Sequence, residues 1–277
     1  MNTTERAKRP QNLVGAVLVG IVLLYGLVLV AAPFIAVLGG AFSRGGEALI
    51  RELTRPDVLI AFRLSLIAAF TAVIINTIAG IALAWVLVRH EFRGKHFFDA
   101  LVDAPFIFSP VIFGYTMIVL FGRLGWFKTE SVALVYSPLA VVIATVFVTL
   151  PFVVREVQPI LASLRREQED AAATMGASRW RTFRRVILPQ ISRALGFGIM
   201  LTFIRAIGDY GAVAVAGGQI ERTTETATVY LQRALDDRNN VGGYGIALVL
   251  IVLSILSLVI MDVLRRGKTG VALRRGE

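Results

Sequence analysis

The sequence contains no cysteine, only two histidines and few charged residues. The absence of cysteine excludes disulfide bonds, thiolate metal sites and cysteine nucleophiles. His90 and His96 lie six residues apart in a basic stretch with no third ligand candidate nearby, so we interpret them as solvated loop residues and predict no metal site. Charged residues make up 17% of the 277 residues, whereas an ordinary soluble domain has about 25%.

Apolar residues are correspondingly abundant. They make up 56% of the chain, and its mean hydropathy is +0.71. One globular core cannot bury this surplus, and a chain so rich in Leu, Ile, Val and Phe collapses rather than staying disordered. These figures predict an integral membrane protein.

Six apolar stretches are long enough to cross a bilayer, because a helix needs about 20 residues to span roughly 30 Å of hydrocarbon. They are residues 13–38, 60–88, 101–122, 134–154, 194–217 and 243–264. None alternates with a period of two, as the strands of a membrane barrel would. The first is about twice as long as the 7–15 apolar residues of a signal peptide, so we expect an uncleaved helix. We predict an all-α polytopic membrane protein with six transmembrane helices in a single domain, residues 1–277.

The basic residues predict the orientation. Of 29 Lys and Arg residues, eight lie in the connections on one side, two (Arg63 and Arg205) lie inside predicted spans, and the other 19 lie on the side of both termini. By the positive-inside rule both termini are cytoplasmic. This distribution accounts for the net charge of +10 without a nucleic-acid partner, and we expect Arg63 to snorkel to the interface.

The second predicted span carries a regular stripe of small residues. The stripe consists of Ala68, Ala72, Asn76, Gly80 and Ala84. Residues four apart share one helix face, and small side chains there let another helix approach closely. We expect this face to be a helix contact, with a position of Asn76 on a solute path as the alternative.

The longest polar segment, residues 155–193, predicts two short helices. Acidic residues and alanines favour a helix from Glu169 that ends at Gly176. Ser178 can cap a second, amphipathic helix that Pro189 closes. The pair forms either a rigid knob presented to the cytoplasm or an interfacial helix that anchors the loop to lipid.

This segment resembles the EAA loop of bacterial ABC importer permeases. The matching residues are Asp170, Ala171, Ala172, Gly176, Val186, Leu188 and Pro189, with Asp in place of the usual Glu and Val in place of Ile. The resemblance implies the type I ABC importer permease fold. It also implies that the 155–193 loop is a coupling helix that docks on a separate ATPase subunit.

Further segments resemble the sulfate/thiosulfate permeases, particularly their W-type subunit. They are residues 103–106, 109–111, 151–156, 207–213, 217–220 and 223–226. The resemblance implies a permease subunit in the bacterial cytoplasmic (inner) membrane, working with a second permease of the T-type, an ABC ATPase dimer and an extracytoplasmic anion-binding protein. Molybdate/tungstate permeases share much of this pattern. A channel or secondary transporter that works without ATP is the alternative from a different class.

We predict that the chain is not itself an enzyme. The nearest approach to a phosphate-binding loop, Gly267-Lys268-Thr269, has Asp262 where the first glycine should stand, so the chain needs no cofactor of its own and ATP is bound by the partner ATPase. The sequence also offers no HExxH motif, Ser/His pair or paired intramembrane acids.

Two charges mark the fifth predicted span. Arg205 and Asp209 lie four residues apart on one helix face, where a charge costs about 2.5–3.5 kcal/mol on insertion scales. They form either a structural ion pair or part of the translocation path, in which Arg205 attracts or gates a dianion and Asp209 holds it. Gly208 and Gly211 can loosen the helix there. The predicted path residues are thus Arg205, Asp209, Gly208 and Asn76.

Overall fold

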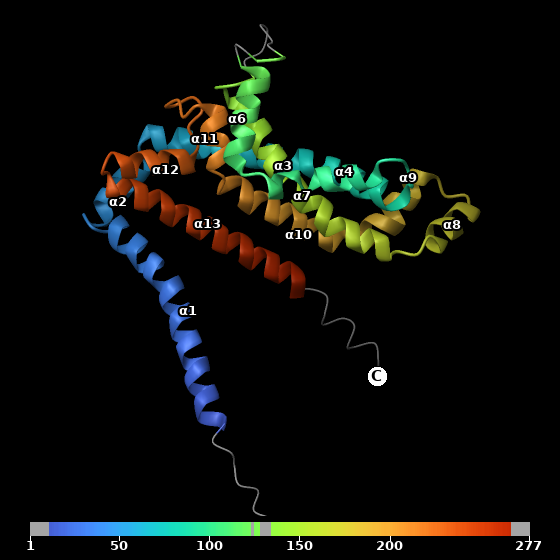
Figure 1. Ribbon diagram of the computed structural model, residues 1–277, viewed down its shortest axis with the longest axis horizontal. Coiled ribbons are helices and arrows are strands. Elements are labelled where there is room, and N and C mark those ends of the chain that lie inside the picture. The colour runs from blue at the N-terminus through green and yellow to red at the C-terminus, as the bar shows by residue number, and fades with distance from the viewer. Residues whose placement is uncertain (1–10, 123–124, 128–133, 267–277) are drawn as a thin grey trace, which may run out of the picture.

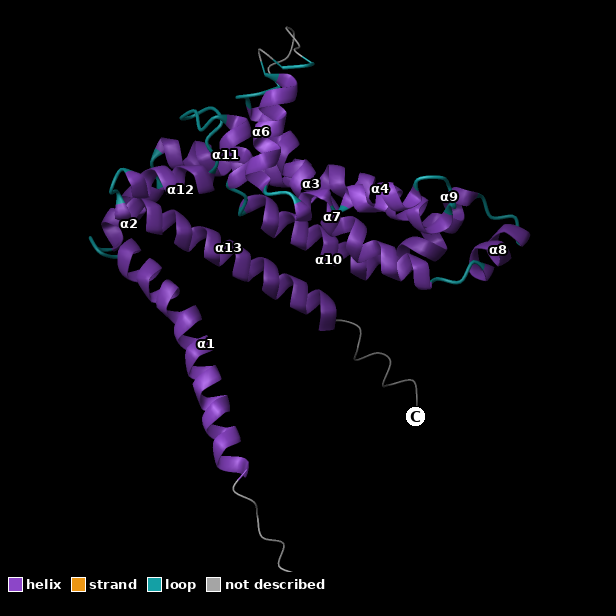
Figure 2. Cartoon of the chain, viewed as in Figure 1, coloured by secondary structure: helices purple, strands orange, loops and turns teal. Residues whose placement is uncertain are grey.

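The computed structural model describes residues 11–122, 125–127 and 134–266. Within these ranges the chain consists of helices joined by turns and loops, without strands, which confirms the all-α prediction (Figure 2). The segments 1–10 and 267–277 lie outside the described residues. Gly267-Lys268-Thr269 and several of the basic residues used to predict the orientation therefore lie outside them too.

Five helical segments are long and apolar enough to cross a membrane. They are α1 (Gln11–Ala41), α3 (Pro56–Arg89), α7 (Pro138–Ser163), the continuous run 179–207, and α13 (Asn240–Arg266). Short helix α2 (Gly46–Leu53) joins α1 to α3. Figure 1 shows α3, α7, α10 and α13 running side by side, whereas α1 points away from them and its most apolar window is 0% buried.

The third predicted span is not one helix, so the expectation of a continuous helix over 101–122 is wrong. The chain instead forms α4 (Lys95–Val102), α5 (Ala104–Ile107) and α6 (Pro110–Phe121). Ser109 has extended backbone angles (φ −59°, ψ 136°), because the ring of the following Pro110 disfavours the helical conformation there. Hydropathy alone cannot detect such a break.

The fifth predicted span, 194–217, is interrupted as well. Helix α10 (Leu188–Ile207) ends before Gly208, and α11 (Gly211–Gly217) and α12 (Ala227–Asp236) follow. The prediction of one continuous helix over 194–217 is therefore wrong. Hydropathy could not show the break at Gly208–Tyr210, because the break does not change the composition.

Pro189 does not close the preceding helix, contrary to the prediction. Helix α9 (Arg179–Thr182) continues through a π-helical turn, η1 (Phe183–Ile187), into α10. In that turn the Leu188 N–H donates to the Phe183 carbonyl five residues earlier. Pro189 has no N–H to continue the regular α-helical hydrogen bonds, and the π-helical turn lies just before it. The segment 179–207 is therefore one long helix, so the predicted second helix of the loop is continuous with the fifth span.

The centre of the fold is the contact of α3 with α7 and α10. The stripe residues Ala68, Ala72, Asn76, Gly80 and Ala84 are all buried, which confirms the helix-contact interpretation. Val153 of α7 lies between two glycines: an added Cβ would lie 2.7 Å from its Cγ1 at Gly80, and 2.8 Å from its Cα at Gly198. Side chains at these two positions would force the helices apart.

We predict that Gly198→Ala lowers the free energy of unfolding by about 1–3 kcal/mol, because overpacking costs this much and the obstructing atom belongs to the backbone. Thermal unfolding of the purified chain in one detergent measures the effect. Gly196→Ala is the matched control on the same helix, since nothing lies within 4 Å of an added Cβ there. Equal melting temperatures for the two variants would contradict the prediction.

Candidate coupling loop and translocation site

The connection between α7 and α9, residues 164–178, carries most of the EAA-like pattern. Helix α8 (Glu167–Thr174) ends in a turn at Gly176, which has φ +76°. The Gly176 and Ala177 N–H groups donate to the carbonyls of Ala173 (2.9 Å) and Ala172 (3.0 Å), the usual closure of a helix by a left-handed glycine. The Ser178 hydroxyl accepts from the Arg181 N–H at 3.4 Å. The predicted helix, glycine turn and capped helix are confirmed.

The matching residues of this pattern divide into two groups. Asp170, Ala171 and Gly176 are exposed, and beside them the side chains of Met175 and Trp180 are 88% and 69% exposed. By contrast Leu188 packs against the buried cluster that includes Ile187. An exposed apolar tip on a turn of defined geometry is typical of a surface that another protein covers.

Two pieces of broken helix meet inside the fold. An added Cβ at Gly211, the first residue of α11, would lie 3.0 Å from Val111 Cγ2 and 3.4 Å from Pro110 Cβ. The break before α6 therefore lies beside the break before α11. Within the hydrocarbon core of a membrane, irregular backbone occurs where protein buries it or where it lines a water-filled cavity. Discontinuous helices of this kind often form solute sites.

The predicted pair Arg205–Asp209 is formed at this break. Arg205 Nη1 lies 3.1 Å from Asp209 Oδ1, and the two side chains are 36% and 1% exposed. The Asp209 carbonyl accepts from the Thr228 hydroxyl at 2.6 Å, while its second carboxylate oxygen, Oδ2, is buried without a hydrogen-bond partner. The ion pair exists, and contact of Arg205 with a solute stays a prediction.

The other two predicted path residues lie in different settings. Gly208 has helical angles (φ −86°, ψ 0°), so it ends α10 without needing the conformational freedom of glycine. Asn76 is 0% exposed and donates to the Val146 carbonyl (3.0 Å) and the Thr149 hydroxyl (2.8 Å). It holds α3 against α7, and its placement on a solute path stays a prediction.

Sequence reasoning missed a guanidinium that is shared by two carboxylates. Arg155 of α7 donates to both carboxylate oxygens of Asp103, at 2.7 Å and 2.6 Å, and to Asp99 Oδ1 at 2.8 Å. Burial acts to raise the pKa of Asp99, but hydrogen bonds from Arg155 and Gln158 outweigh it and hold that pKa below its ordinary value. This cluster fixes α4 and α5 to α7.

A second ionic cluster that the sequence did not reveal lies at the opposite end of the helices. Arg233 of α12 donates to both carboxylate oxygens of Glu225 (2.7 Å and 3.0 Å) and to Glu221 (2.7 Å). Burial raises the pKa of Glu225, and the neighbouring Arg233 opposes this rise. The contacts fix the loop before α12. The sequence shows that these residues are charged, but no local pattern indicates which of them form pairs.

Comparisons with known proteins agree with this architecture. Residues 76–270 match the family described as "binding-protein-dependent transport system inner membrane component". The sulfate transport system permease protein CysW of Synechocystis sp. is 38% identical over 257 residues, which cover 91% of this chain and 93% of that protein. The sulfate transport system permease protein CysT of Escherichia coli K12 is 36% identical over 217 residues, covering 77% of this chain and 78% of that protein.

A solved structure shares the fold. The bacterial alginate ABC transporter in complex with an alginate pentasaccharide-bound periplasmic protein aligns with a TM-score of 0.75, covering 93% of this chain and 95% of that chain. The sequence identity is 14%, so the likeness concerns the fold alone.

We predict that Arg155→Gln lowers the free energy of unfolding by about 1.5–3 kcal/mol, the usual range for hydrogen bonds to charged groups. Because the pKa of Asp99 is lowered in the folded chain, its contribution is present above the unfolded value of about 3.9 and is lost only in more acidic solution. Melting temperatures at pH 6 and pH 8 should therefore fall by the same amount. Arg93→Gln, an exposed change of equal charge, is the control. An Arg155→Gln variant as stable as this control would refute the prediction.

Proposed function

The chain belongs to the binding-protein-dependent transport system inner membrane components, and from that premise we propose that it is a permease subunit of an ATP-driven sulfate/thiosulfate importer. The observation that carries the coupling role is the geometry of residues 164–178. A rigid helix, a left-handed Gly176 and a capped second helix present Met175 and Trp180 to a partner. The anion is proposed from the CysW and CysT relatives, which are named as sulfate permeases.

In this proposal the 164–178 loop faces the cytoplasm of a bacterium and docks on one subunit of an ABC ATPase dimer. The ATPase binds and hydrolyses ATP, and the permease contributes no cofactor of its own. Closure of the ATPases moves the loop and switches the permease pair from inward-open to outward-open. Release of the anion to the cytoplasm follows hydrolysis.

The remaining partners of the proposed complex are a second permease of the T-type and an extracytoplasmic anion-binding protein. The binding protein delivers the anion to the face on the side of α2 and α12. Both termini lie in the cytoplasm, consistent with the excess of basic residues on that side. The family description, a binding-protein-dependent transport system, supports a binding protein as a partner.

For the translocation path we place Arg205 at the solute side of the break between α10 and α11. Its side chain is 36% exposed although it belongs to an apolar helix, and Asp209 holds it from one side. A guanidinium suits a tetrahedral oxyanion because its donors match the oxygens in geometry and charge. The neighbouring break before α6 supplies the irregular backbone that such a path requires.

Uptake of labelled sulfate by a bacterial strain lacking its own sulfate permeases tests the function. We predict that the chain, expressed with its companion permease, ATPase and binding protein, restores sulfate uptake, and that Met175→Glu lowers it at least tenfold by placing a charge in the docking surface. Trp126→Ser, at a similarly exposed apolar residue outside the loop, should leave uptake unchanged. Uptake that persists without the ATPase would show a channel or secondary transporter. Preferential uptake of labelled molybdate would assign a different anion.

A pair of variants separates the two roles of Arg205. We predict that Arg205→Gln lowers sulfate uptake at least tenfold and that the double variant Arg205→Gln/Asp209→Asn does not recover it, because the guanidinium itself attracts the dianion. If the ion pair is only structural, removal of both charges should restore uptake, since no buried carboxylate is left unpaired. Recovery in the double variant, at wild-type amounts of complex in the membrane, would remove Arg205 from the path.

A further inference from the structure

Helix α8 is held in place by polar contacts. None of its residues, Glu167–Thr174, is buried, and it lies at one extremity of the molecule in Figure 1. The Gln190 side chain of α10 donates to Gln168 at 2.9 Å. The other contacts of α8 and of the residues before it are made with Arg89 at the end of α3. Among the described residues, the position of α8 relative to the membrane helices therefore depends on a few hydrogen bonds and one ion pair.

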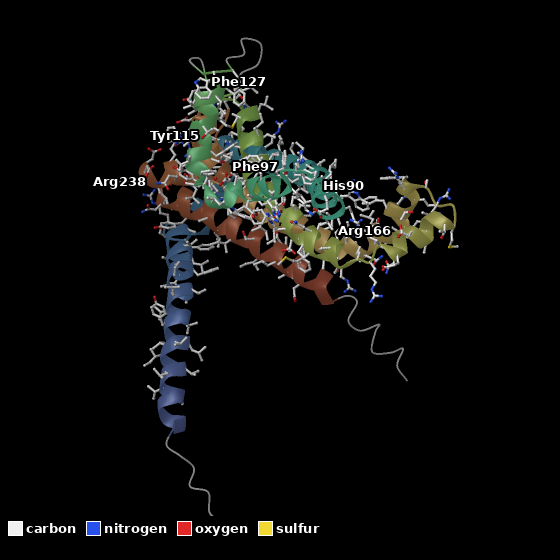
Figure 3. The ribbon with its side chains drawn as sticks, turned by 45° about the vertical axis from the view of Figure 1, so that its right-hand side comes forward. His90, Phe97, Tyr115, Phe127, Arg166 and Arg238 are labelled. Atoms are coloured by element: carbon white, nitrogen blue, oxygen red, sulfur yellow. The ribbon has the colours of Figure 1, made fainter. Side chains whose placement is uncertain are left out.

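That ion pair joins Glu169 to Arg89, the last residue of α3. Arg89 Nη2 lies 2.6 Å from Glu169 Oε1, and the two side chains are only 9% and 23% exposed. Arg89 Nη2 also donates to the Leu164 carbonyl at 3.3 Å. In the opposite direction, Arg166 Nη2 donates to the Arg89 carbonyl at 3.0 Å, and Figure 3 shows Arg166 close to His90 at this junction. Both ends of the connection into α8 thus converge on one residue.

The helical residues that follow the 164–178 loop contact the same turn of α3 through aromatic rings. Trp85 packs edge-on against Phe183 at 6.0 Å between centroids, and Phe183 stacks with Trp180 at 5.7 Å. The Arg89 guanidinium carbon lies 5.9 Å from the centroid of the Trp85 ring. One helical turn, Trp85 to Arg89, therefore contacts α8 directly through Glu169 and reaches Trp180 of α9 through Phe183 of η1.

Helix α3 leads from this turn to the break that contains Asp209. Ala69 of α3 packs against Ala206 and Ile207, the last residues of α10. Twenty residues of α-helix separate Ala69 from Arg89, a length of about 30 Å. One face of α3 is buried along this length and Asn76 joins it to Thr149 of α7, so we treat this part of α3 as one rigid element.

We propose that the Arg89–Glu169 ion pair is a positioning contact that transmits movement of the 164–178 loop to α3, and through α3 to the α10–α11 break. The inference rests on the proposed importer function, since it assigns the route by which the ATPase drives the permease. Arg89 and Glu169 touch neither ATP nor the anion in this scheme. They fix the loop so that its displacement becomes displacement of the helix.

Charge reversal in the reconstituted complex tests this route. Arg89→Glu and Glu169→Arg, each alone, should lower the amount of sulfate transported per ATP hydrolysed at least tenfold, with basal ATP hydrolysis retained. The double swap Arg89→Glu/Glu169→Arg should return the ratio to within threefold of the wild-type value. The matched control is Arg89→Glu/Glu167→Arg, which has the same net charge but places the arginine at an exposed position two residues away, and it should stay uncoupled.

A distance measurement reads the same contact without any substrate. The chain has no cysteine, so spin labels can be attached at Ala173→Cys on α8 and Ile78→Cys on α3, both exposed positions. The distance distribution between the labels should be narrow with Arg89 and Glu169 present, at least twice as broad in Arg89→Glu, and narrow again in the double swap. A purely local stabilising role would leave the transport ratio unchanged while broadening this distribution.

The proposal is overturned if Arg89→Glu keeps the wild-type ratio of sulfate to ATP, or if the double swap assembles fully but restores neither readout. If the Arg89→Glu complex does not assemble, Glu169→Gln takes its place, because it removes the charge with little change of shape. Its ratio of sulfate to ATP and its label distances are then compared with those of the wild type. Wild-type complex that carries no sulfate, together with labels that respond as described, would refute the proposed anion and leave the positioning contact standing.

Discussion

The fold depends on one close approach, in which Val153 of α7 is enclosed by Gly80 of α3 and Gly198 of α10. Lipid tails are as apolar as the side chains they surround, so helices in a bilayer associate mainly through van der Waals packing and interhelical hydrogen bonds. Two glycines allow three backbones to come within packing distance of one valine. Asn76 adds hydrogen bonds to the Val146 carbonyl and the Thr149 hydroxyl one turn further along.

This three-helix contact gives α3 its central place. In its first half, at Ala69, α3 packs against the last residues of α10, beside the break at Gly208–Tyr210. At its C-terminal end it meets the loop that carries the EAA-like pattern. Helix α3 thereby joins the proposed docking surface to the proposed solute site. Two interrupted helices lie on one side of this unit, where Gly211 contacts Pro110 and Val111.

The long helices and the loop could be predicted from the sequence because each has a local signal. Apolar length identifies α3 and α13, and Gly176 followed by Ser178 identifies the helix–turn–helix of the loop. The broken spans could not be predicted in this way, because hydropathy records composition and not backbone direction. Pro105, Pro110 and the cluster Gly208–Gly211 were the available clues.

The long-range ion pairs could not be predicted from the sequence, because their partners are far apart in the chain. Arg89 and Glu169 are 80 residues apart, and Arg155 and Asp103 are 52 apart, so nothing local pairs them. Each ion pair depends on how the helices pack together, whereas the pattern of apolar residues predicts individual helices and not their packing. The Arg205–Asp209 pair could be predicted, because residues four apart on a helix lie on the same face.

The π-helical turn Phe183–Ile187 has a consequence for how such a loop can vary. A turn of this kind takes up one residue more than an α-helical turn without rotating what lies beyond it. If the same residues followed an α-helical path, Trp180 would turn by about 100° around the helix axis and leave the side on which Phe183 meets Trp85. The one extra residue of this turn therefore sets which side of the helix axis Trp180 of α9 faces, separately from the packing of α10 among the membrane helices.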